Sequence, residues 1–124
     1  MDDKIVHRDL SYKIVGLAID IRKELGYGYL EKVYENAMMM MLNRNGISAQ
    51  QQVPLKVMFQ GVVIGDYFPD IVVENEIILE IKSQDRIIDA NKAQTLNYLK
   101  TTGLKLAIIL NFGKTKLDYE RLVY

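Results

Sequence analysis

The 124-residue sequence contains no cysteine, two prolines and a single histidine, His7. Without cysteine, a disulfide framework and a thiolate zinc site are both excluded, and the cytosol is the expected compartment. The start of the chain has no apolar core of signal-peptide length, and no stretch approaches the roughly 18 apolar residues of a membrane helix. We therefore expect a cytoplasmic protein, with His7 on its surface and outside any catalytic site.

An excess of either charge is also missing, because sixteen basic and sixteen acidic residues give a formal net charge of zero. Constitutive nucleic-acid binders usually carry a basic excess, so this balance disfavours one, although it permits an enzyme whose phosphate contacts are local. Hydrophobic residues make up 49% and charged residues 26% of the sequence, which is typical of a globular protein. We find no repeat or linker and expect one domain over residues 1–124.

Hydrophobic periodicity predicts three helices, over residues 10–25, from 29–31 to 43, and from Asp89 as N-cap to Thr101, with Gly103 as the stop. Strands are predicted at 53–59 and 62–64, with a break at Gly65–Asp66, and later at 104–110 and 118–124. Alternation in the first of them places Val53, Leu55, Val57 and Phe59 on one face. A hairpin over residues 67–82 completes the pattern. The order ααβββαβ, with a possible last strand, indicates an α/β (α+β mixed) fold with a mixed four- to five-stranded sheet flanked by helices.

The hairpin over residues 67–82 carries the most informative residues. Two aliphatic runs flank Glu74-Asn75-Glu76, and a turn centred on Asn75 would place Asp70 opposite Glu80. Opposed Cβ atoms in antiparallel strands are roughly 4.5–5.5 Å apart. The side chains of Asp70, Glu80 and Lys82 would share one face of the hairpin, with aliphatic residues on the other.

Two opposed carboxylates repel each other unless a cation lies between them, and Mg2+ or Mn2+ suits a pair of carboxylates. Asp70, Glu80 and Lys82 are therefore candidates for a metal-dependent catalytic centre. The alternative is a solvated outer face of an edge hairpin, on which the acids and the lysine have no special role.

Two further segments carry candidate residues. Gln94 and Tyr98 lie four residues apart on one face of the third helix, where they could position a phosphate or a nucleobase. Alternatively, they form the half-buried polar flank of an amphipathic helix. Glu31 opens the second helix, where stabilisation by the helix dipole would alone explain an acid.

At these positions the sequence resembles a known family. Gly28-Tyr-Leu-Glu31-Lys-Val-Tyr34 matches the Gly-x-x-Glu-x-x-Tyr signature of the GxxExxY proteins, which are assigned to the PD-(D/E)xK nuclease superfamily with its restriction-endonuclease-like fold. Pro69-Asp70, Glu80-Ile81-Lys82 and Gln94-x-x-x-Tyr98 continue the match along nearly the whole chain. Tyr27 departs from the signature, since many members carry proline there.

The resemblance implies that Asp70 and Glu80 are metal ligands and that Lys82 is the catalytic lysine. The backbone carbonyl of Ile81 is the expected third ligand, and Glu31 corresponds to a helix acid that approaches the metal in several members. The Gln94/Tyr98 pair resembles a motif that accompanies this core in RecB-like nucleases. The implied cofactor is Mg2+ or Mn2+.

The sequence thus predicts a metal-dependent nuclease that hydrolyses phosphodiester bonds of nucleic acid, with DNA favoured over RNA. A homodimer or a partner protein could supply additional contacts to the substrate. One alternative is a catalytically silent nucleic-acid- or protein-binding module on the same fold. A third possibility, a structural dimer subunit, rests on an apolar edge formed by residues 104–110.

Overall fold

The computed structural model describes residues 7–124, which fold into three helices and seven strands. The helices are α1 (Arg8–Leu25), α2 (Glu31–Arg44) and α3 (Asp89–Thr102). The strands are β1 (Ala49–Gln51), β2 (Leu55–Phe59), β3 (Val62–Tyr67), β4 (Ile71–Val73), β5 (Ile77–Lys82), β6 (Leu106–Phe112) and β7 (Leu117–Val123). Most elements lie where the sequence predicts them; β1 was not predicted.

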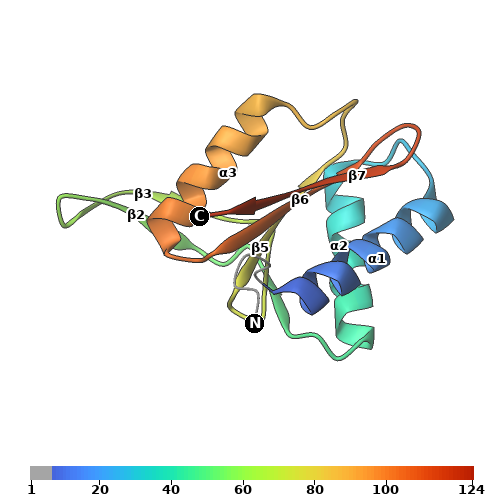
Figure 1. Ribbon diagram of the computed structural model, residues 1–124, viewed down its shortest axis with the longest axis horizontal. Coiled ribbons are helices and arrows are strands. Elements are labelled where there is room, and N and C mark those ends of the chain that lie inside the picture. Colours follow the sequence, from blue (N-terminus) through green and yellow to red (C-terminus); the bar gives the residue numbers. More distant parts are fainter. Residues whose placement is uncertain (1–6) are drawn as a thin grey trace.

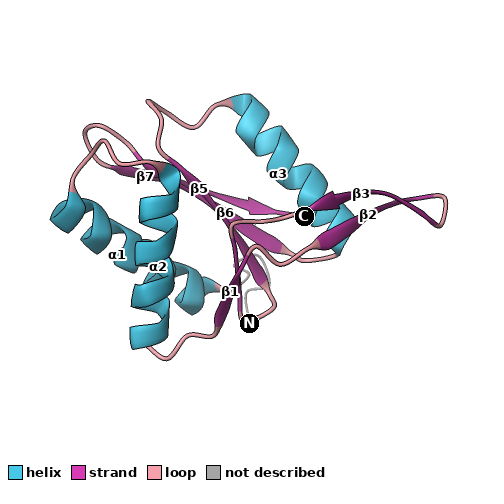
Figure 2. Ribbon diagram, turned by 180° about the vertical axis from the view of Figure 1, so that it is seen from behind, coloured by secondary structure: helices cyan, strands magenta, loops and turns pink. Residues whose placement is uncertain are grey.

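Five of the strands form one mixed sheet in the order β1-β4-β5-β6-β7, which confirms the predicted fold class (Figures 1 and 2). The central pair β5–β6 is parallel, and the other pairs are antiparallel. Helices α1 and α2 pack on one face of the sheet and α3 on the other. β2 and β3 form a separate two-stranded hairpin beside α3.

The core lies on both faces of the sheet because the strands alternate between two apolar clusters. Ile71 and Leu79 belong to the larger cluster with α1 and α2, whereas Ile78 joins Leu99 of α3 in the smaller one. Ile78 is fully buried. The face of the β4–β5 hairpin that carries Glu80 is therefore covered, and the alternative of a solvated edge hairpin is wrong.

The hairpin has the predicted register, with the pairs Ile71–Leu79, Val72–Ile78 and Val73–Ile77. Its turn uses Glu74 and Asn75 with φ values of 53° and 57°. Positive φ at both central positions is the type I′ geometry, which matches the twist of antiparallel strands. This turn fixes the alignment that brings the two ends of the hairpin together.

Four local predictions are wrong. Gly65–Asp66 does not break the chain but pairs within β3, and the break falls at Pro69, which cannot donate to a ladder. Asp89 is the first residue of α3, because Ile88 is the N-cap and donates its N–H to the Asn91 side chain. The segment 104–110 is no sheet edge, because β6 pairs on both sides.

Phe59 does not continue the face of Leu55 and Val57, because a β-bulge between Val57 and Met58 shifts the register. The hairpin beyond the bulge projects from the body and exposes its apolar side chains to between 46% and 62%: Met58, Phe59, Val62, Val63 and Ile64. We call this set the exposed hairpin tip.

A buried amide fixes the loop that follows β5. Asn111 is fully buried; its Oδ1 accepts the Gln84 N–H at 3.0 Å and its Nδ2 donates to the Gln84 carbonyl at 2.9 Å. The Gln84 side chain in turn donates to Asn91 Oδ1 at 2.7 Å. These bonds tie the chain directly after Lys82 to β6 and α3.

Asn111→Leu should destabilise the fold by about 1–3 kcal/mol, because it leaves the Gln84 backbone groups without partners. Urea unfolding measures the change, with the exposed Asn43→Leu as a control expected to stay within about 0.5 kcal/mol of wild type. Equal stability of Asn111→Leu and wild type would show that the hydrogen bonds of the Asn111 side chain contribute nothing to the free energy of unfolding.

Candidate active site

The two predicted acids lie at the open end of the β4–β5 hairpin. Asp70 immediately precedes β4, beyond the last strand pair, and its Oδ2 accepts the Ile81 N–H at 2.7 Å. Glu80 is half-buried on β5 and accepts a hydrogen bond at Oε1 from the Tyr67 hydroxyl. Carboxylate oxygens of this kind are chemically suited to bind a divalent cation.

The charges of the two acids and of Lys82 affect one another. The pKa of Glu80 is raised to about 7, chiefly by burial and further by the charge of Asp70. Burial also raises the pKa of Asp70, with smaller contributions from the charges of Glu35 and Glu31. The Lys82 ammonium opposes both shifts. A bound cation would relieve the same cost, since it favours the charged form of both acids.

Tyr67 is a site residue that sequence reasoning missed. It is the last residue of β3, is 8% exposed and stacks on Tyr98 of α3 with the ring planes 14° apart. Burial and the charge of Glu80 raise the pKa of its hydroxyl, which therefore stays protonated and donates. The only sequence signal was its position three residues before Asp70.

The α3 candidates reach the site unequally. Tyr98 is half-buried, and burial together with the charge of Glu80 raises its pKa. Gln94 is exposed on the helix and interacts with the Tyr98 hydroxyl. The Tyr98 ring thus contacts Tyr67, which bonds Glu80, and Gln94 interacts with Tyr98.

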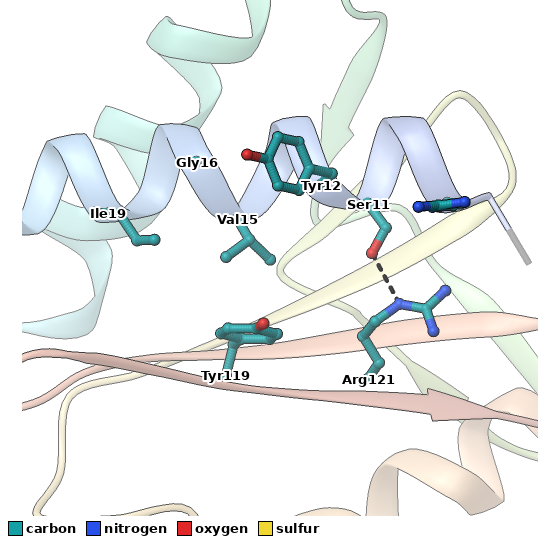
Figure 3. Close-up of a pocket in the computed structure, with 8 residues that line it drawn as sticks. Ser11, Tyr12, Val15, Gly16, Ile19, Tyr119 and Arg121 are labelled. Atoms are coloured by element: carbon teal, nitrogen blue, oxygen red, sulfur yellow. Dashed lines mark hydrogen bonds between the residues drawn. The ribbon is translucent and has the colours of Figure 1, made fainter. Parts of the chain in front are cut away.

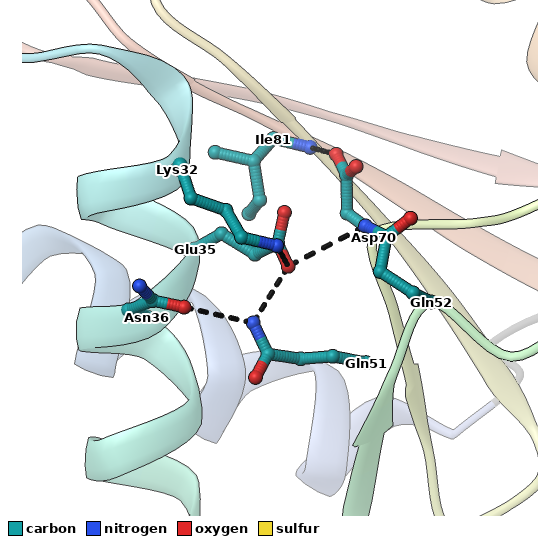
Figure 4. A network of polar contacts seen from close by, with 7 residues as sticks. All are labelled: Lys32, Glu35, Asn36, Gln51, Gln52, Asp70 and Ile81. Atoms are coloured by element: carbon teal, nitrogen blue, oxygen red, sulfur yellow. Dashed lines mark hydrogen bonds and ion pairs between the residues drawn. The ribbon is translucent and has the colours of Figure 1, made fainter.

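A second missed residue is Glu35, one turn beyond Glu31 on α2. Glu31 is exposed, whereas Glu35 is 4% exposed and its Oε2 accepts from Lys32 Nζ at 3.0 Å and Gln51 Nε2 at 2.6 Å. Figure 4 shows this network beside Asp70. The charge of Glu35 affects Asp70 more than that of Glu31 does. The sequence signal that could have identified Glu35 is its position beside Tyr34 and Met38, which lie on the buried face of α2.

The other signature residues have structural roles. Gly28 has a φ of 111°, which favours glycine. Tyr34 is fully buried, donates its hydroxyl to the Gly26 carbonyl at 2.7 Å and stacks on Phe112. Gly28 and Tyr34 therefore determine the shape of the turn that leads into α2, and with it the position of Glu31, the first residue of that helix.

His7 lies apart from the acids, as predicted. Its Nδ1 is 3.0 Å from the Glu76 carboxylate in the turn of the β4–β5 hairpin, at the end opposite to Asp70.

The residues partly fit a divalent cation. Within residues 7–124, no three Asp, Glu or His side chains are placed closely enough to bind one. Asp70 and Glu80 nevertheless supply two carboxylate oxygens beside Lys82, and the remaining ligands of Mg2+ are commonly waters and substrate phosphate.

A separate cavity of about 380 Å³ lies between α1 and β7 (Figure 3). Its walls include Tyr12, Tyr119 and Arg121, whose Nε donates to Ser11 Oγ at 2.9 Å. No acidic side chain lines it, so it is not the candidate active site.

The mixed five-stranded sheet flanked by helices has the arrangement of the restriction-endonuclease-like fold. The sequence matches the model of the PD-(D/E)XK nuclease superfamily over residues 8–122, and the chain belongs to that superfamily.

The fold is similar to that in the crystal structure of SSO0001, with a TM-score of 0.58 and 15% sequence identity. The similarity covers 94% of this chain and 57% of SSO0001. No curated protein matches the sequence significantly. Among the described helices, none is both long and apolar enough to span a bilayer.

The raised pKa of Glu80 gives a prediction for stability against pH. The pKa is about 7 in the folded chain against 4.5 ordinarily, so the folded state holds the extra proton in that interval. Stability without metal should therefore fall as pH rises from about 4.5 to 7. Glu80→Gln cannot ionise and should reduce this loss, which urea unfolding in EDTA at pH 5 and pH 8 measures.

The exposed Glu24→Gln is the control and should follow wild type. If Glu80→Gln loses as much stability as wild type between the two pH values, the ionisation of Glu80 is not the cause.

Proposed function

We propose that the chain is a metal-dependent nuclease that hydrolyses phosphodiester bonds, with DNA favoured over RNA. The observation that carries this proposal is the convergence of Asp70 and Glu80 beside Lys82 in a member of the PD-(D/E)XK superfamily. Nucleases of this superfamily generally depend on divalent metal. Two acids with raised pKa values next to a lysine are groups tuned by their surroundings, as is typical of functional sites.

In the proposed mechanism, Asp70, Glu80 and the Ile81 carbonyl would hold Mg2+ or Mn2+. The ion, when bound, supplies a water of lowered pKa and neutralises charge on the phosphate. Lys82 orients that water or stabilises the charge of the transition state. On α2 we assign the supporting acid to Glu35 as well as Glu31, because Glu35 has the larger effect on Asp70. Gln94 and Tyr98 lie on the α3 side of the acids.

We also propose a narrower family for the chain. We assign the chain to the GxxExxY subfamily on the Gly28-x-x-Glu31-x-x-Tyr34 signature. We further propose a cytoplasmic location and a nucleic-acid substrate, both of which fit that assignment.

The decisive experiment is cleavage of fluorescent single- and double-stranded DNA and RNA in Mn2+ and in Mg2+. Asp70→Ala should abolish metal-dependent cleavage, and Lys82→Ala should keep metal binding and lose about 100-fold or more in rate. The exposed Asp20→Asn and Lys105→Ala are matched controls that should cleave as wild type.

If Lys82→Ala cleaves as fast as wild type, its assigned role is wrong. If wild type and Asp70→Ala are both inactive on every substrate, the silent binding module becomes the better interpretation. A melting temperature that Mn2+ raises in wild type but not in Asp70→Ala would still show a metal site.

We also propose that the exposed hairpin tip is the contact between two copies of the chain. Its five apolar side chains are exposed to between 46% and 62%, and residues 57–65 carry no charge that could attract phosphate. The nearby charges, Lys56 and Asp66, pair with each other at 3.7 Å. Zero net charge means that two copies do not repel.

Wild type should therefore be a dimer by light scattering after size-exclusion chromatography, and Val62→Lys/Ile64→Lys a monomer of similar melting temperature. The exposed Tyr12→Lys on α1 is the control and should remain a dimer. A monomeric wild type, or a dimeric double variant, would overturn this assignment.

A further inference from the structure

We infer that Tyr67 is a positioning residue for the metal ligand Glu80, and that Tyr98 of α3 acts on the metal site through Tyr67. This inference rests on the proposed metal-dependent function. It assigns to two tyrosines a role that the sequence motifs do not: Tyr67 lies outside the motif residues, and Tyr98 acts on Glu80 by holding the ring of Tyr67.

The first step is the bond between Tyr67 and Glu80. The Tyr67 hydroxyl donates to Glu80 Oε1; the Tyr67 side chain is buried and Glu80 is half-buried on β5. A buried hydroxyl that loses its acceptor costs free energy, so the structure favours keeping this bond. The bond therefore holds Glu80 Oε1 toward β3 and orients the carboxylate.

The second step is what holds Tyr67 in place. Its ring belongs to the smaller apolar cluster with Ile78, Leu99 and Ala107, and Tyr98 packs against this cluster. Tyr98 stacks on Tyr67 with ring planes 14° apart, and this contact restricts rotation of the Tyr67 ring away from Glu80. The stack needs the Tyr98 ring but not its hydroxyl.

Tyr67 and Tyr98 thus form a chain of contacts that runs from α3 to a metal ligand. In metal sites generally, partners that orient a ligand contribute 10–100-fold to metal affinity. Loss of the Tyr67 hydroxyl should lower affinity in this range. Loss of the Tyr98 ring should lower metal affinity only in a chain that still has the Tyr67 hydroxyl.

The test measures the Mn2+ dissociation constant by calorimetry for wild type, Tyr67→Phe, Tyr98→Phe, Tyr98→Leu and the double variant Tyr67→Phe/Tyr98→Leu. Tyr67→Phe should weaken binding about tenfold and Tyr98→Leu several-fold, whereas Tyr98→Phe should stay within about twofold of wild type. The double variant should bind as Tyr67→Phe does, because the two act in series. Tyr119→Phe, an exposed tyrosine on β7, is the control.

Two readouts separate positioning from general damage. Melting temperatures in EDTA should stay within a few degrees of wild type, and the rise in melting temperature on adding Mn2+ should shrink in Tyr67→Phe and Tyr98→Leu. If Tyr67→Phe does not fold, the comparison of Tyr98→Leu with Tyr98→Phe tests the inference, since both variants keep the Tyr67 hydroxyl.

A Tyr67→Phe dissociation constant within twofold of wild type overturns the inference, and so does a Tyr98→Leu effect that persists in full in the Tyr67→Phe background. If wild type binds no Mn2+, both the inference and the proposed metal mechanism fall. If wild type binds Mn2+ and only the tyrosine effects are missing, the inference alone falls.

Discussion

The hydrogen bond from the Ile81 amide to the Asp70 carboxylate is the contact on which the arrangement of the candidate site depends. The β4–β5 ladder ends at Ile71–Leu79, and at the next position a side chain takes the place of a backbone acceptor. Asp70 is thereby held against β5 beside Glu80. The backbone geometry of the hairpin, set at its far end by the type I′ turn, thus determines where the first acid lies.

Much of this could be predicted from the sequence, because the features concerned are local. Alternation of Ile71 to Leu79 around Asn75 gave the register, and a shift by one residue would have turned Glu80 into the larger apolar cluster. The periodicity of α1 and the stop at Gly103 follow from the same kind of short-range pattern. The mixed five-stranded sheet then follows from the order of elements.

The remainder depends on contacts between distant segments, which leave little trace in a single sequence. Tyr67 resembles any strand-end tyrosine until α3 brings Tyr98 onto its ring. Glu35 looks like a surface acid until Gln51 of β1, a strand that was not predicted, donates to it. The edge role given to residues 104–110 failed for a related reason, since an apolar strand does not reveal how many neighbours it has.

The parallel pairing of β5 with β6 has a consequence for the kinetics of folding. Parallel neighbours need a crossover, so β6 can join β5 only after the chain containing α3 has folded back across the sheet. Glu80 lies on β5 and Tyr98 lies within that crossover, so the two residues meet only after α3 has packed on the sheet. A ligand that needs both would bind the native state and little before it. It would therefore slow unfolding and leave the folding rate nearly unchanged.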